Sequence, residues 1–148
     1  MASPATSSID TPSRAGDEVV LPVEATTLIY RGTIVAKNAA GNAVPAADAA
    51  GFVVMGRAEG PGNNAVGDAD NSSGDAGDIG CRIGRGIFRW NNSTAHPVSK
   101  VHRGQVGYCE DDNTVGTDPG TNKIAAGHIV DVDDDGVWID TRTAPLAV

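Results

Sequence analysis

Short β-prone runs separated by turn residues constrain the fold of this chain more than any other feature. The 148 residues include 19 glycines and 8 prolines. β-branched residues gather between them, as in TLIYRGTIVAKN (27–38) and IAAGHIVDV (124–132). Frequent glycines and prolines between β-branched runs favour short strands joined by turns over long helices. The sequence therefore predicts a compact all-β barrel or sandwich of about nine or ten short strands, with almost no helix.

The predicted β-domain covers residues 17–148 and follows an extended N-terminal arm. Residues 1–16 are rich in Ser, Thr, Ala and Pro and have almost no apolar anchors, which is typical of a segment that orders only on a partner. The first predicted strand, DEVVLPVEA (17–25), contains Pro22, which favours an edge position or a bulge. Residues 60–78 form a long acidic Gly/Asn-rich loop, a kind of segment that is usually functional or mobile.

The run IGCRIGRGIFRWN (79–91) changes the side of the chain on which its large apolar residues fall. Cys81 and Ile83 share one parity, whereas Phe88 and Trp90 share the other. A strand whose buried face changes in this way needs a bulge or a bend. The alternative is that both faces are buried there, one by the core and one by a partner.

Charge is spread unevenly along the chain, whose formal net charge is −8. Residues 59–78 hold five acids and no Lys or Arg, and residues 79–108 hold five bases and no acid. The net charge argues against a sequence-independent nucleic-acid binder, which needs a basic face. The two segments form either complementary surfaces in an oligomer or lattice, or separate solvated faces.

The two cysteines, Cys81 and Cys109, lie in β-like runs without metal-binding spacing. We expect two small buried thiols, and a single cross-strand disulfide is the alternative. No apolar segment has the character of a signal peptide or the length of a membrane span, so we expect no membrane partner.

The stretch DVDDDGVWID (131–140) resembles both a calcium loop and a hairpin turn. If Asp131 is the first position of a calcium loop, Asp133, Asp135 and Gly136 fit, but the twelfth position is Arg142, which cannot bind a cation. Both flanks are β-branched, and Asp-Gly between apolar strands is a strong hairpin signal. The sequence therefore predicts a hairpin turn, with a weak cation site formed by clustered carboxylates as the alternative.

Residue patterns typical of enzymes are missing from the sequence. The three histidines have no metal-ligand spacing, and there is no nucleophile elbow, HExxH motif or phosphate-binding loop. We therefore expect a protein that is not an enzyme and needs no cofactor or metal.

Three motifs resemble a known family. They are G-x-F-R-W at residues 86–90, the pair Tyr108 and Cys109 before an acidic Asp-Asn-Thr-Val turn, and the closing G-x-x-V-D-V-D-x-D-G-V-W hairpin. With the strands around them, from about residue 17 to 140, they resemble the capsid cement (head decoration) proteins of tailed bacteriophages. The long 60–78 segment and the tail TRTAPLAV depart from the family pattern.

This resemblance implies a β-barrel-like protein on the outer surface of the expanded phage head, made in the cytoplasm of the host bacterium. Its partners would be the major capsid protein and further copies of itself, with a homotrimer favoured and a dimer possible. It would bind neither nucleic acid nor membrane. The candidates for contact with the capsid or between subunits are Ile9, Arg14, Arg85, Arg89 and Trp90, with ordinary core packing as the alternative for Trp90. The competing class is a carbohydrate- or cation-binding β-module of a phage tail or a host-adhesion accessory.

Overall fold

Twelve β-strands and two single-turn 3-10 helices make up the secondary structure of the computed structural model, which describes residues 6–8, 10, 16–65 and 73–143. The all-β prediction is confirmed. The strands are β1 (Glu18–Pro22), β2 (Leu28–Ile29), β3 (Ile34–Lys37), β4 (Ala43–Pro45), β5 (Val53–Ala58), β6 (Gly62–Asn63), β7 (Gly80–Gly84), β8 (Ile87–Asn92), β9 (Val106–Cys109), β10 (Thr114–Gly116), β11 (Ala125–Asp133) and β12 (Gly136–Asp140). The 3-10 helices are η1 (Lys100–His102) and η2 (Thr141–Thr143).

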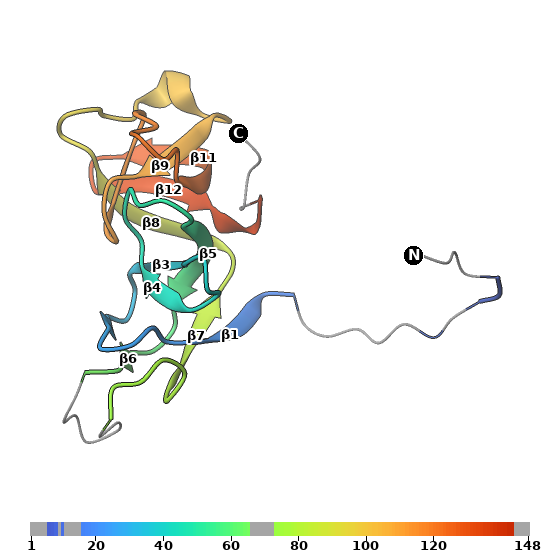
Figure 1. The fold of residues 1–148 in the computed structure, drawn as a ribbon. Helices are drawn as coiled ribbons and strands as arrows, with labels where there is room; N and C mark the ends of the chain where they lie inside the picture. Colours follow the sequence, from blue (N-terminus) through green and yellow to red (C-terminus); the bar gives the residue numbers. More distant parts are fainter. Residues whose placement is uncertain (1–5, 9, 11–15, 66–72, 144–148) are drawn as a thin grey trace.

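The strands form a closed barrel, an open sheet and a small pair. The barrel has the order β10-β8-β12-β11-β9 and closes because β9 also pairs with β10. The open sheet has the order β1-β7-β5-β3-β4, and β2 pairs with β6 in a separate two-stranded sheet. In Figure 1 the barrel lies at one end of the molecule, with β1, β7 and β6 toward the other.

Two apolar clusters hold these layers together. The larger cluster joins one face of the open sheet to the inside of the barrel and includes Ile34, Val54 and Ile139. The smaller cluster lies on the other face of the open sheet and includes Val35 and Ile83. β3 is therefore buried on both faces, because its successive side chains alternate between the two clusters.

The predicted change of parity in 79–91 is confirmed, and its cause is a change of sheet. β7 belongs to the open sheet and β8 to the barrel. Ile83 accordingly packs in the smaller cluster, whereas Trp90 packs in the larger one. A Cβ on Gly84, where β7 ends, would lie 1.9 Å from a carboxylate oxygen of Glu59, so a side chain at this bend would have to displace the Glu59 carboxylate.

The strand count exceeds the expected nine or ten for two reasons. Residues 79–91 hold two strands instead of one, and β6 lies inside the predicted 60–78 loop. The middle of that loop, residues 66–72, lies outside the described part of the chain. The edge position expected from Pro22 is confirmed, because β1 is an outer strand of its sheet.

Both cysteines are buried free thiols, and no disulfide joins them. Burial, with the nearby Asp111 carboxylate, raises the pKa of Cys109 to about 12. Within the described residues no helix has the length and apolar character needed to cross a membrane.

Candidate interaction surface

The pairing of β8 with β12 places an arginine beside a tryptophan on the outside of the barrel. Arg89 is the Cα partner of Trp138, and Ile87 is the partner of Asp140. The Arg89 side chain is 42% exposed, Ile87 is 43% exposed and Trp138 is half-buried. The Arg89 guanidinium lies 5.5 Å from the centre of the Trp138 ring, a cation–π contact. We call Ile87, Arg89 and Trp138 the Arg89–Trp138 face.

The closing hairpin fixes the orientation of Trp138. Asp133 Oδ1 accepts hydrogen bonds from the backbone N–H groups of Asp135, at 2.8 Å, and Gly136, at 3.1 Å. Its Oδ2 accepts a bond of 2.8 Å from Trp138 Nε1. The hairpin prediction is confirmed, because β11 and β12 pair up to Asp133 and Gly136. Asp133 uses both carboxylate oxygens to build the turn and orient the indole.

Ion pairs extend the Arg89–Trp138 face on both sides. Arg89 Nη1 lies 3.7 Å from Asp135 Oδ2. On the next strand, Asp131 is the Cα partner of Trp138, and its Oδ1 atom lies 2.7 Å from Arg103 Nη2. The outside of the barrel therefore carries a row of alternating charges with one aromatic ring among them.

The same ion pairs bear on the uneven charge of the sequence. Three of the five bases in 79–108 pair with acids of this chain that lie outside residues 59–78: Arg82 with Glu18, Arg89 with Asp135 and Arg103 with Asp131. Each pair is partly exposed, so each contributes little to stability. This pattern favours the interpretation of separate solvated faces over matched acidic and basic surfaces.

The contact candidates named from the sequence fall in different places. Arg89 lies on the surface, whereas Trp90 is only 4% exposed and donates from Nε1 to the Gly32 carbonyl at 2.9 Å. The core-packing alternative therefore holds for Trp90 in this chain. Arg85 Nη2 bonds the carbonyl of Arg142 at 3.2 Å, which ties the β7–β8 connection to η2. Ile9 and Arg14 lie outside the described residues.

Trp138 is the surface residue that the sequence interpretation missed. Its neighbours Val137 and Ile139 are fully buried, so the residue between them must point outward. The sequence itself indicates this orientation. If buried and exposed side chains alternate strictly after the Asp-Gly turn, Trp138 and Asp140 point outward. The position of each tryptophan within its strand therefore distinguishes the surface residue Trp138 from the core residue Trp90, although residue type does not.

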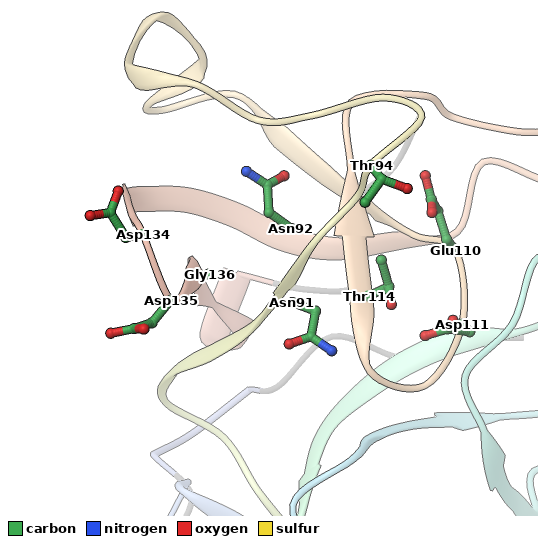
Figure 2. Close-up of a pocket in the computed structure, with 9 residues that line it drawn as sticks. All are labelled: Asn91, Asn92, Thr94, Glu110, Asp111, Thr114, Asp134, Asp135 and Gly136. Atoms are coloured by element: carbon green, nitrogen blue, oxygen red, sulfur yellow. The ribbon is translucent and has the colours of Figure 1, made fainter.

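A shallow polar depression of about 570 Å³ lies beside the hairpin. Figure 2 shows the side chains around it: Asp134 and Asp135 on one side, Glu110 and Asp111 on the other, and Asn91, Asn92, Thr94 and Thr114 between them. Glu110 already accepts from the Ser93 hydroxyl, and Asp111 accepts from the Asn113 backbone at 2.8 Å. No aromatic ring lines the depression, and the described residues contain no group of three or more His, Cys, Asp or Glu that could hold a metal ion.

Acid is expected to loosen the closing hairpin. The Trp138 indole N–H, followed by the turn amides and the Arg89 charge, holds the pKa of Asp133 below its ordinary value. A carboxyl whose pKa is lowered on folding stabilises the fold above its unfolded pKa of about 3.9, and this contribution is lost as the pH falls through the folded pKa. NMR of the Trp138 indole N–H between about pH 6 and pH 2 should show a transition centred below that value.

The Asp133→Asn variant provides the control for this titration. Its side-chain amide is uncharged, so the transition should disappear. A transition in the wild-type protein at or above the ordinary carboxyl value would contradict the assigned contacts.

No protein-family model, curated protein or solved structure matches this chain. The fold and the surface therefore supply the argument about function. They combine a twelve-stranded scaffold with an outward Arg–Trp pair held by a hydrogen-bonded turn.

Proposed function

We propose that this chain is a structural binding protein, and in particular a capsid cement protein of a tailed bacteriophage. In this role it binds the outside of the expanded icosahedral head and stabilises the junctions between capsid subunits. It performs no catalysis and needs no cofactor. Its partners are the major capsid protein and further copies of itself.

The Arg89–Trp138 face is the observation that carries this proposal. Tryptophan and arginine are the residue types most enriched among the energetically dominant positions of protein interfaces. Both residues project from paired strands, and Asp133 fixes the ring, so little conformational entropy is lost when the face is covered. Ile87, 43% exposed on the same face, adds apolar area.

The positions of the family-like motifs support the proposal. The G-x-F-R-W segment forms β8, the Tyr108–Cys109 pair ends β9, and the closing motif forms β11 and β12. These strands are neighbours in the closed barrel. The motifs that carry the resemblance therefore lie together in one barrel, and two of them supply Arg89 and Trp138.

Charge and the N-terminal arm suit the same role. A protein with a formal net charge of −8 is better placed on the outside of a capsid than against packaged DNA. The arm, residues 1–16, with Ile9 and Arg14, is proposed to lie on neighbouring capsid subunits and to become ordered there. The carbohydrate- or cation-binding alternative draws no specific support from the depression beside the hairpin, whose acids are divided between its two sides.

Trp138→Ala is expected to weaken binding to expanded, undecorated capsids by about 30-fold, because an interface tryptophan of this kind is worth about 2 kcal/mol. Arg89→Ala should weaken binding in the same direction. Co-sedimentation at increasing protein concentration measures both affinities and the copy number per capsid.

Val101→Ser is the matched control, because Val101 is 77% exposed, lies on η1 and is not part of the Arg89–Trp138 face. Thermal unfolding of each variant establishes that the fold is retained. If Trp138→Ala and Arg89→Ala bound as well as the wild-type protein, the Arg89–Trp138 face would not be the contact surface.

A further inference from the structure

Three neighbouring strands of the barrel carry an outward row in which opposite charges flank an aromatic ring. Arg89 of β8 is the Cα partner of Trp138 of β12, and Trp138 is also the Cα partner of Asp131 of β11. These three strands lie side by side in the barrel (Figure 1). Because neighbouring strands are about 4.8 Å apart, the positive and the negative residue flank the indole at similar distances. The sign of the charge therefore reverses from one side of Trp138 to the other.

Both charged ends of this row are open to solvent. The Arg89 side chain is 42% exposed, and the Asp131 side chain is 51% exposed. Val130, beside Asp131 at the bulge of β11, is 43% exposed and adds apolar area. The row therefore offers another molecule a ring at its centre and opposite charges at its two ends.

A row of this kind is complementary to itself. In a two-fold interface, residue i of one copy contacts residue j of the other, and residue j contacts residue i. A two-fold axis that runs along β12 through Trp138 exchanges the two sides of the row. Arg89 of each copy then lies opposite Asp131 of the other copy. The two indoles meet at the axis, where aromatic rings favour offset or edge-to-face contact.

We propose that the Arg89–Trp138 face, together with Asp131, binds the same face of a second copy of this chain about this axis. Each half of the interface then holds a network of four alternating charges, which are Arg103 and Asp131 of one copy and Arg89 and Asp135 of the other. The outer links of this network are ion pairs that each chain already forms, at 2.7 Å for Arg103–Asp131 and 3.7 Å for Arg89–Asp135. Asp131 and Arg89 each keep their own partner and gain an opposite charge from the other copy.

The charges select this axis over its alternatives. A two-fold axis across the strands would set Arg89 against Arg89 and Asp131 against Asp131, and such contacts between like charges are costly. An axis between β12 and β8 would move Asp131 away from Arg89 of the other copy. On the proposed axis Asp140 meets Asp140, but this side chain is only 17% exposed and lies 2.9 Å from Arg142 of its own copy. A second copy is therefore the occupant whose charges fit this surface.

This inference rests on the proposed function in one respect, because the dimer covers the surface that is proposed to bind the capsid. In free solution two copies cover each other's Arg89–Trp138 face, and a capsid subunit displaces the second copy. The dimer should be weak, since exposed ion pairs contribute little. It should weaken further as the salt concentration rises, because salt screens charges at the surface.

A charge swap tests the proposed axis. Sedimentation velocity of the full chain, at concentrations up to about 1 mM, should show a concentration-dependent dimer for the wild-type protein. Arg89→Asp and Asp131→Arg each place like charges opposite one another, so each variant alone should self-associate at least about 10-fold more weakly. An equimolar mixture of the two variants should restore the dimer, because the row of one variant is then wholly acidic and that of the other wholly basic.

The ion pair between Arg82 and Glu18 provides the matched controls, because both residues lie in the open sheet outside the barrel. Arg82→Asp and Glu18→Arg make the same changes of net charge and should dimerise like the wild-type protein. Circular dichroism should show that every variant remains folded. A wild-type protein that stays monomeric, a dimer that both row variants retain, or a mixture that fails to recover the dimer would each overturn the proposal.

Co-sedimentation with expanded capsids separates this inference from the proposed function. Asp131→Arg keeps Arg89 and Trp138, so it should bind capsids at least as tightly as the wild-type protein while its dimer is lost. Loss of capsid binding by an Asp131→Arg variant that still dimerises would assign Asp131 to the capsid contact and overturn the inference. Capsids that bind neither protein would contradict the proposed function alone, since the sedimentation result decides the dimer.

Discussion

Gly136→Ala is expected to destabilise the fold by about 2–4 kcal/mol, a large part of the roughly 5–15 kcal/mol that holds a typical domain together. Gly136 has a φ of 153°, which side chains rarely adopt. A Cβ there would lie 2.2 Å from the carbonyl oxygen of Trp90 on the neighbouring strand. The methyl group can be accommodated only if β12 moves away from β8, which would break the barrel at its closing hairpin. Urea denaturation measures the change in the free energy of unfolding.

Gly60→Ala is the matched control, because a Cβ on Gly60 meets nothing within 4 Å. The expected change in its free energy of unfolding is within about 0.5 kcal/mol. Equal losses of unfolding free energy in the two variants would show that the close approach of β8 and β12 at Gly136 does not determine the stability of the fold.

Trp90→Ala is expected to cost about 3–5 kcal/mol and to lower Tm by on the order of 10 °C. The side chain fills the interior of the barrel, where its ring centre lies 5.8 Å from that of Phe88. Truncation leaves a cavity and removes the donor that satisfies the Gly32 carbonyl. Calorimetry of the wild-type protein and the variant measures the shift.

Trp138→Ala removes the same side chain from the outer face of the adjacent strand and is the comparison for this result. Its half-buried ring contributes less apolar burial, so the loss of stability should be well below that of Trp90→Ala. The two variants should therefore separate stability from capsid binding. Similar losses of stability would contradict the assignment of Trp90 to the core and Trp138 to the surface.

The sequence predicts most of the strands because local pattern determines them. The alternation in 79–91 and the Asp-Gly turn after Asp133 each specify a structure within a few residues. β6 is different, since Gly62 and Asn63 have little β-propensity. It forms because the buried Asn64 side chain donates to the carbonyls of Val23, Glu24 and Asp75, which holds the segment beside β2.

Local sequence patterns do not determine the order of the barrel strands either. β10 runs parallel to β8, although β9 precedes it in the chain and pairs with it antiparallel. Closure of the barrel therefore depends on long-range contacts that no single segment encodes. For the candidate surface, residue type pointed to arginine and tryptophan. Trp138 and Trp90 differ only in the face of the strand from which each side chain projects. The sequence interpretation chose Trp90, which is buried.

The central proposal is that this protein strengthens a phage head from outside. The most direct test is to heat expanded, undecorated capsids of the phage proposed to encode it, with and without the purified protein, and to record the temperature at which the capsids rupture. Near-stoichiometric binding and a clear rise in that temperature, reduced by Trp138→Ala, are the predicted results. Capsids that rupture at the same temperature with and without saturating protein would contradict the account.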